Sequence, residues 1–79
     1  MHHQPLPRDR VIARRRAIGE RIRAVRLHAN LTQETVSLRS GIGLASYNRI
    51  EQGHASPMLD SLIRIADAIG VPLSDLVRT

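Results

Sequence analysis

The segment from Leu59 to Gly70 carries the strongest structural signal in the chain. Its apolar side chains recur at steps of three and four residues, which places them on one face of an α-helix: Leu59, Leu62, Ile65, Ala66 and Ile69. Gly70 predicts the end of this helix, because glycine readily adopts a left-handed backbone conformation. The alternation of polar and apolar residues that marks a strand occurs nowhere in the sequence. We therefore expect an all-α fold.

Four further helices are expected from the same kind of evidence. An apolar stripe predicts a helix from about Arg15 to Asn30, with Ile18, Ile22, Val25 and Ala29 as its members. Val11 continues this stripe one heptad earlier, which allows the helix to begin well before Arg15. Thr32 is the expected N-cap of a short helix that ends near Arg39. Two more helices are expected at about 44–52 and 72–77, and Pro57 is expected at the first position of the Leu59 helix.

The length of 79 residues leaves room for one small domain. We expect residues 15–79 to form this domain and residues 1–14 to be a basic, flexible arm. The chain has no cysteine, which excludes disulfides and zinc sites built on cysteine. His2 and His3 are adjacent, but no third ligand lies at a helical spacing. We expect no metal, no other cofactor and no small-molecule ligand.

Positive charge is concentrated at the N-terminus, where residues 1–26 hold eight arginines against Asp9 and Glu20. Such a basic end suggests a polyanionic partner, either a nucleic acid or an acidic membrane. Residues 8–17 lack the bulky apolar face that membrane-surface binding requires. No apolar run approaches the roughly 18 residues of a membrane span, and no signal-peptide pattern is present. We expect a soluble cytoplasmic protein and no membrane partner.

The stretch from Leu31 to Gly53 has the organisation of a helix-turn-helix. A short helix, a turn at Gly41 and a second short helix can cross at the steep angle that this motif needs. In that geometry the second helix enters the major groove of DNA. The inward-facing residues would hold the two helices together: Val36, Ser40, Ile42, Tyr47 and Ile50. Tyr47 is therefore expected in the core, with its hydroxyl free to reach solvent or a phosphate.

Several motifs in the expected order resemble a known family, the phage repressor and Cro-like helix-turn-helix domains, also called the xenobiotic-response-element type. The resemblance covers about Ile18 to Val77, and its motifs are Thr32-Gln33-Glu34, Ser40-Gly41-Ile42, Arg49-Ile50-Glu51-Gln52-Gly53 and the segment 56–71. It implies a five-helix repressor-like DNA-binding domain, double-stranded DNA as the partner, and a transcriptional regulator as the function.

The resemblance also implies roles for individual residues. Gln33 would contact a phosphate and brace the second helix of the motif, and Gln52 would meet the DNA backbone again. The positions that face the bases would be Leu44, Ala45, Ser46 and Arg49, with Asn48 at the edge. Ser46 and Asn48 fit an ordinary exposed helix face equally well. Arg26 and Glu51 occupy the positions of a common salt bridge between the first and third helices.

Some positions depart from the family pattern. Gly43, also expected among the DNA-binding residues, stands where a Ser or Thr commonly caps the base-reading helix, and glycine caps without a side-chain acceptor. Ser37 replaces a small apolar residue, and Leu38 replaces a charged one. Neither Leu44 nor Ala45 can donate a hydrogen bond, so base reading there would depend on thymine methyl groups and DNA shape.

A homodimer on a palindromic operator is expected, because the C-terminal part of the chain has more apolar residues than a small monomer can hide. The candidates for the interface are Ile63, Val71, Leu73, Leu76 and Val77. An enzyme is not expected, since no nucleophilic cysteine, Gly-rich phosphate loop or carboxylate pair is present. The alternative is an antitoxin-like or other protein-interaction module that uses the same fold.

Overall fold

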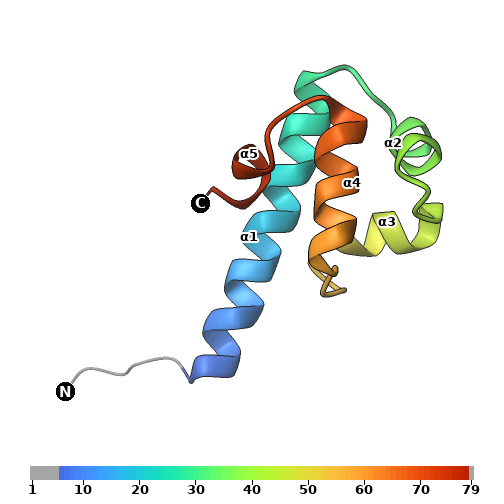
Figure 1. Ribbon diagram of the computed structural model, residues 1–79. Coiled ribbons are helices and arrows are strands. Elements are labelled where there is room, and N and C mark those ends of the chain that lie inside the picture. The colour runs from blue at the N-terminus through green and yellow to red at the C-terminus, as the bar shows by residue number, and fades with distance from the viewer. Residues whose placement is uncertain (1–5, 79) are drawn as a thin grey trace.

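The computed structural model describes residues 6–78, and five α-helices account for most of them (Figure 1). No strand occurs among these residues, which confirms the all-α prediction. The helices are α1 (Pro7–His28), α2 (Gln33–Ser40), α3 (Leu44–Glu51), α4 (Leu59–Ile69) and α5 (Leu73–Val77).

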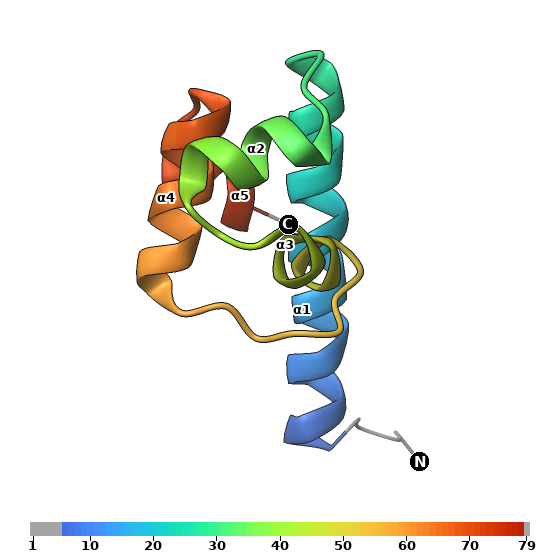
Figure 2. The same cartoon turned by 90° about the vertical axis from the view of Figure 1, so that its right-hand side faces the viewer.

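The long helix α1 organises the molecule. Its C-terminal half packs against α3 and α5, while α2 packs against α3 and α4, and α4 against α5 (Figures 1 and 2). The N-terminal half of α1 projects beyond the other helices in both views. This projection makes the molecule elongated, with principal extents of 48 × 21 × 19 Å.

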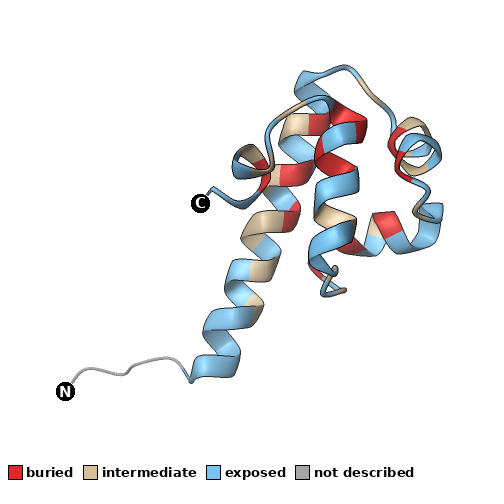
Figure 3. Cartoon of the chain, in the orientation of Figure 1, coloured by how far each residue is buried: buried red, intermediate tan, exposed pale blue. Residues whose placement is uncertain are grey.

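The core is almost wholly aliphatic. Its fully buried side chains come from all five helices: Ile22, Val36, Tyr47, Ile65 and Leu76 (Figure 3). Burying one large aliphatic side chain stabilises the fold by about 1.5–3 kcal/mol. Because Tyr47 is the only aromatic residue of the sequence, aliphatic contacts supply nearly all of this stabilisation.

Local backbone chemistry sets most of the helix boundaries as predicted. Asn30 adopts a left-handed conformation (φ 59°) just beyond α1, and Gly41 does the same (φ 73°) after α2. The Thr32 side chain accepts a hydrogen bond from the backbone N–H of Thr35, at 3.1 Å, and so caps α2. Gly70 (φ 91°) ends α4. Pro57, in contrast, precedes α4 by two residues, so its predicted place at the first helical position is wrong.

Residues 7–14 of the expected basic arm are helical, as the position of Val11 in the α1 stripe allows. Pro7 occupies the start of α1, where its fixed φ suits the helix and its missing N–H costs nothing. From there the helix runs 22 residues to His28 without interruption. Residues 1–5 lie outside the part of the chain that the structure describes, and with them the two adjacent histidines.

Two predictions about apolar residues are also corrected. Leu76, a candidate for a dimer interface, is fully buried in the chain's own core and has no surface to offer a partner. Leu59, whose spacing predicts a place on the packed apolar face of its helix, is 63% exposed. It is the first residue of α4, and the packed face of this helix begins one turn later, at Leu62.

Candidate nucleic-acid interface

Helix α3 presents one face to solvent and buries the other. The exposed face carries Leu44, Ala45, Ser46 and Arg49, and Asn48 lies half-buried at its edge. The opposite face is formed by Tyr47, Ile50 and Glu51, which are all buried. The helix begins after Gly43, whose backbone has φ −56° and whose side-chain position is open space. A second macromolecule could therefore approach the start of α3 closely.

The Glu51 carboxylate holds α3 in place from its buried side. Its Oε2 accepts a hydrogen bond from Arg26 Nε at 2.6 Å, and its Oε1 accepts one from Arg26 Nη2 at 3.0 Å. The Tyr47 hydroxyl donates to the same carboxylate, so it does not reach solvent. Arg26 also donates from Nη1 to the carbonyl oxygen of Leu31, at 2.9 Å. This buried ion pair, expected from the sequence, joins α1 to α3.

Gln33 links this buried cluster to the exposed face of α3. Its Nε2 donates to Glu51 Oε1 at 3.0 Å, and its Oε1 accepts a hydrogen bond from Asn48 Nδ2 at 2.9 Å. The side chain therefore spans from the core to the edge of α3. Because Gln33 is the first residue of α2, these two bonds fix the start of α2 against α3.

The pKa values reflect this arrangement. Burial alone raises the pKa of Glu51, but hydrogen bonds from Arg26, Tyr47 and Gln33 outweigh it and lower the pKa below its ordinary value. The hydrogen bond to Glu51 raises the pKa of Arg26. Burial, followed by the hydrogen bond to Glu51, raises the pKa of the Tyr47 phenol. Glu51 and Arg26 are thus both charged at neutral pH, and the cluster is a fixed structural element.

Two serines shape the turn between α2 and α3. The Ser37 hydroxyl donates to the carbonyl oxygen of Ile42, and the Ser40 hydroxyl donates to the carbonyl of Ser37 at 3.3 Å. The Ser40 oxygen also accepts from the backbone N–H of Ile42, at 3.3 Å. Ser37, which departs from the family pattern, therefore stabilises the turn with a hydrogen bond that an apolar residue could not make.

Gly19 is a structural residue that the sequence interpretation missed. A Cβ atom at Gly19 would lie 2.6 Å from the carbonyl oxygens of both Ile50 and Glu51. Glycine at this position lets α1 approach the backbone at the end of α3. The available signal was a glycine inside an otherwise continuous helical pattern, which often marks a close backbone approach.

The loop after α3 is held by α1 as well. Arg15 Nε donates to the carbonyl oxygen of Gly53 at 2.9 Å, and a Cβ at Gly53 would lie 2.8 Å from the Arg16 Cα. Gln52, at the end of α3, is exposed. The exposed guanidinium of Arg49 lies 3.4 Å from the carbonyl oxygen of His54, near the outer limit of a hydrogen bond. Arg49 is therefore only weakly held by its own chain.

Two other kinds of site are absent from residues 6–78. No group of three or more His, Asp or Glu side chains comes together there in a way that could hold a metal ion. None of the described helices is long and apolar enough to cross a membrane.

Comparison with known proteins agrees with this geometry. The family model described as helix-turn-helix matches residues 22–76, which include all of α2, α3 and α4. The "Cryptic phage CTXphi transcriptional repressor RstR" of Vibrio cholerae serotype O1 is 36% identical over 59 residues, which cover 75% of this chain and 53% of the repressor. The chain thus spans about half the length of that curated relative.

Two further proteins extend the comparison. The uncharacterized HTH-type transcriptional regulator y4dJ of Sinorhizobium fredii is 33% identical over 63 residues, covering 80% of this chain and 82% of that protein. The crystal structure of the restriction-modification controller protein C.AhdI from Aeromonas hydrophila superposes with a TM-score of 0.79 at 26% identity, covering 81% of this chain and 97% of the controller. On these grounds the chain belongs to the Cro/C1-type helix-turn-helix family.

Proposed function

We propose that this chain binds double-stranded DNA sequence-specifically and regulates transcription by inserting α3 into the major groove. The observation that carries the proposal is the two-sided construction of α3. One side is locked to α1 and α2 through Glu51, while the other exposes Leu44, Ala45 and Ser46, with Arg49 in the last turn of the helix. A rigid helix with such a face fits a base-reading helix in the major groove.

The contacts with bases would differ along α3. Arg49 offers a guanidinium suited to the O6 and N7 acceptors of guanine. Ser46 and Asn48 offer hydrogen bonds near the middle of the helix, and the half-buried Asn48 is oriented by its bond to Gln33. Leu44 and Ala45 offer apolar contact, which suits the methyl group of thymine. Specificity would therefore come from one strong polar contact and several weaker ones.

Phosphate contacts would flank this helix on both sides. The Gln33 amide nitrogen has two hydrogens and uses one on Glu51, which leaves a second donor. It stands at the N-terminus of α2, where backbone N–H groups favour an anion. The backbone at Gly43 and the exposed Gln52 lie at the two ends of α3 and would contact the DNA strands there.

A homodimer on a palindromic operator completes the proposal. Two-fold symmetry would set two copies of α3 about 34 Å apart, which is one turn of B-DNA. Ile63 on α4 and Val77 on α5 are 41% and 37% exposed and are the best candidates for the interface. Val71 and Leu73 are half-buried against the core and would contribute at its edge. Sedimentation of the wild-type protein and of Ile63→Glu tests the proposed dimer. Leu38→Glu, which changes an exposed residue of α2, is the control.

Support for the regulatory role comes from the relatives. One is named a transcriptional repressor, another a transcriptional regulator, and the structural neighbour is a restriction-modification controller. The direct test is selection of tight-binding duplexes from a random pool, followed by sequencing. A recurring palindromic motif would support the proposal. Enrichment of no motif, with equal affinity for all duplexes, would overturn it.

A further inference from the structure

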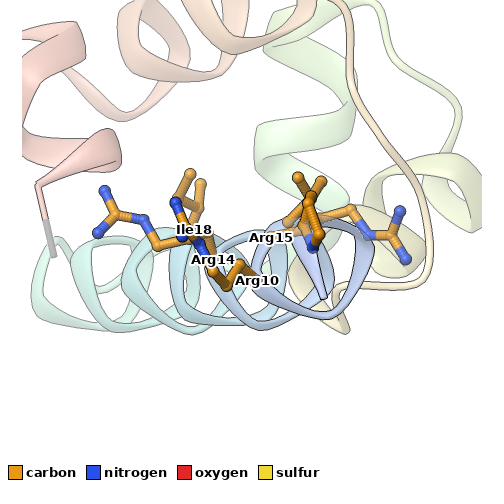
Figure 4. Close-up of a pocket in the computed structure, with 6 residues that line it drawn as sticks. Arg10, Arg14, Arg15 and Ile18 are labelled. Atoms are coloured by element: carbon orange, nitrogen blue, oxygen red, sulfur yellow. The ribbon is translucent and has the colours of Figure 1, made fainter. Parts of the chain in front are cut away.

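The projecting half of α1 carries a groove that the DNA-binding proposal does not use. The α1 groove is lined by six residues: Pro7, Arg10, Val11, Arg14, Arg15 and Ile18 (Figure 4). Its volume is about 380 Å³. In Figure 4 the labelled side chains of the groove stand along one side of α1.

The floor of the α1 groove is apolar. Pro7, Val11 and Ile18 follow one another at steps of four and seven residues, so they share one face of the helix. Val11 is 63% exposed, although it continues the stripe that forms the core further along α1. The core stripe therefore runs out of the folded body onto the part of α1 that projects beyond the other helices (Figures 1 and 2).

The floor continues toward the loop between α3 and α4. A second hollow of about 160 Å³ shares Arg15 and Ile18 with the α1 groove. Its far wall is formed by Ala55, Pro57 and Leu62. The two hollows together make an apolar track, of which the Pro7–Ile18 part alone is about 17 Å long at 1.5 Å per residue.

The rims of the groove are cationic and carry no acid. Arg10 and Arg14, one turn apart, line one side, and Arg15 lines the other. The two acidic residues in this part of α1 point elsewhere: Asp9 and Glu20 each stand two positions from a floor residue, about 200° around the helix. The groove thus combines an apolar floor with positive charge on both sides.

We propose that the α1 groove binds an acidic amphipathic helix of a partner protein. Such a helix would place its apolar stripe on Val11 and Ile18 and its carboxylates beside Arg10, Arg14 and Arg15, the usual arrangement of a helix in a groove. A symmetric pairing of the α1 grooves of two copies fits poorly, because it would bring arginine rims against arginine rims. DNA would engage the arginines but gain little from the apolar floor.

The test is fluorescence anisotropy with synthetic peptides of about 14 residues, or about four helical turns. The first peptide has leucines at helical spacing flanked by glutamates, and the second has the same composition with the spacing scrambled. We expect the wild-type protein to bind the first at least about tenfold more tightly, since only this peptide buries apolar surface on Val11. Equal binding of both peptides would overturn the proposal and indicate a general anion or phosphate surface.

Three variants locate the binding. Val11→Asn and the double change Arg10→Glu/Arg14→Glu should each weaken binding of the first peptide about tenfold or more. Arg23→Glu is the matched control, because this exposed arginine of α1 does not line the groove. Circular dichroism checks that each variant is folded, which is expected for exposed positions. An undiminished affinity of Val11→Asn, or an equal loss in Arg23→Glu, would contradict the proposal.

Two control measurements separate this inference from the proposed function. Val11→Asn should keep its affinity for a selected DNA duplex within about twofold, since the floor makes no contact that DNA binding needs. A loss of DNA affinity equal to its loss of peptide affinity would assign the groove to DNA instead. Sedimentation without peptide completes the test, because a dimer that Val11→Asn dissociates would assign the groove to a second copy.

Discussion

The guanidinium of Arg26 donates two hydrogen bonds to the carboxylate of Glu51, at 2.6 and 3.0 Å, and joins the last turn of α1 to the last turn of α3. The two side chains are only 8% and 2% exposed. Among residues 6–78 every buried side-chain nitrogen and oxygen has a hydrogen-bond partner, so this polar cluster is fully satisfied. The angle at which α3 is presented thus depends on a charged pair inside an aliphatic core.

A substitution of Arg26 or Glu51 should destabilise the intact protein more than it destabilises a variant that already lacks the other partner. Arg26→Ala and Glu51→Ala should each lower the free energy of unfolding by roughly 3–5 kcal/mol, because each leaves a buried charge unpaired. The double variant should lose much less than the sum. A double-mutant cycle by urea unfolding measures this coupling, with Arg64→Ala on exposed α4 surface as control. Additive losses would mean that the two residues act independently.

Acid should weaken the fold through Glu51. Its pKa is lower in the folded chain than in the unfolded chain, so it stabilises the fold above the unfolded pKa of about 4.3. This stability is lost as the pH falls through the lower, folded pKa. Urea unfolding between about pH 6 and pH 3 should therefore show a steeper loss for wild type than for Glu51→Gln, which cannot titrate. Parallel pH profiles would contradict the assignment.

High pH should destabilise the fold through ionisation of the Tyr47 phenol. Because its phenol has a raised pKa in the folded chain, the fold is favoured below the unfolded pKa of about 10 and loses stability as the pH rises above it. As the only aromatic residue, Tyr47 alone produces the phenolate absorbance. This absorbance should appear together with the loss of helical circular dichroism. Phenolate formation in a chain that keeps full helicity would show that the hydroxyl is accessible.

Gly19→Ala should lower the free energy of unfolding by about 1–3 kcal/mol, because the added methyl group overlaps backbone oxygens that cannot easily move. Gly43→Ala is the control, since nothing lies within 4 Å of its Cβ position and its φ is −56°. Its stability should change by less than about 1 kcal/mol. Thermal unfolding compares the two variants. An equal loss of stability in both would contradict the close approach of α1 to α3 at Gly19.

The fold could be predicted from the sequence wherever a helix has an amphipathic stripe or a terminal residue with special backbone chemistry. The stripe of α4 and the left-handed residues Asn30, Gly41 and Gly70 are of this kind. The start of α1 was less accessible, because residues 7–14 are rich in arginine and carry few apolar residues to mark the helix. Leu76 illustrates a further limit: apolar spacing shows that a residue needs burial, but not whether its own chain or a partner provides it.

The candidate site could be predicted in part. The pairing of Arg26 with Glu51 followed from the family resemblance, whereas the bonds of Gln33 to both Glu51 and Asn48 depend on the crossing of α2 and α3. The bond from Ser37 to the Ile42 carbonyl depends likewise on the shape of the turn. The sequence positions of these residues do not indicate that their side chains or backbone atoms meet in the folded chain.

In the proposed complex, α3 reads bases through Arg49, while Gln33 supports the helix and contacts the DNA backbone. The most direct measurement is titration of wild type, Arg49→Ala and Gln33→Ala against a selected duplex and its single-base-pair variants. We predict that Arg49→Ala costs about 1–3 kcal/mol of binding and loses preference at one base pair. Gln33→Ala should weaken binding to every duplex by a similar factor and keep the preference. An equal loss on all duplexes for both variants would contradict the claim.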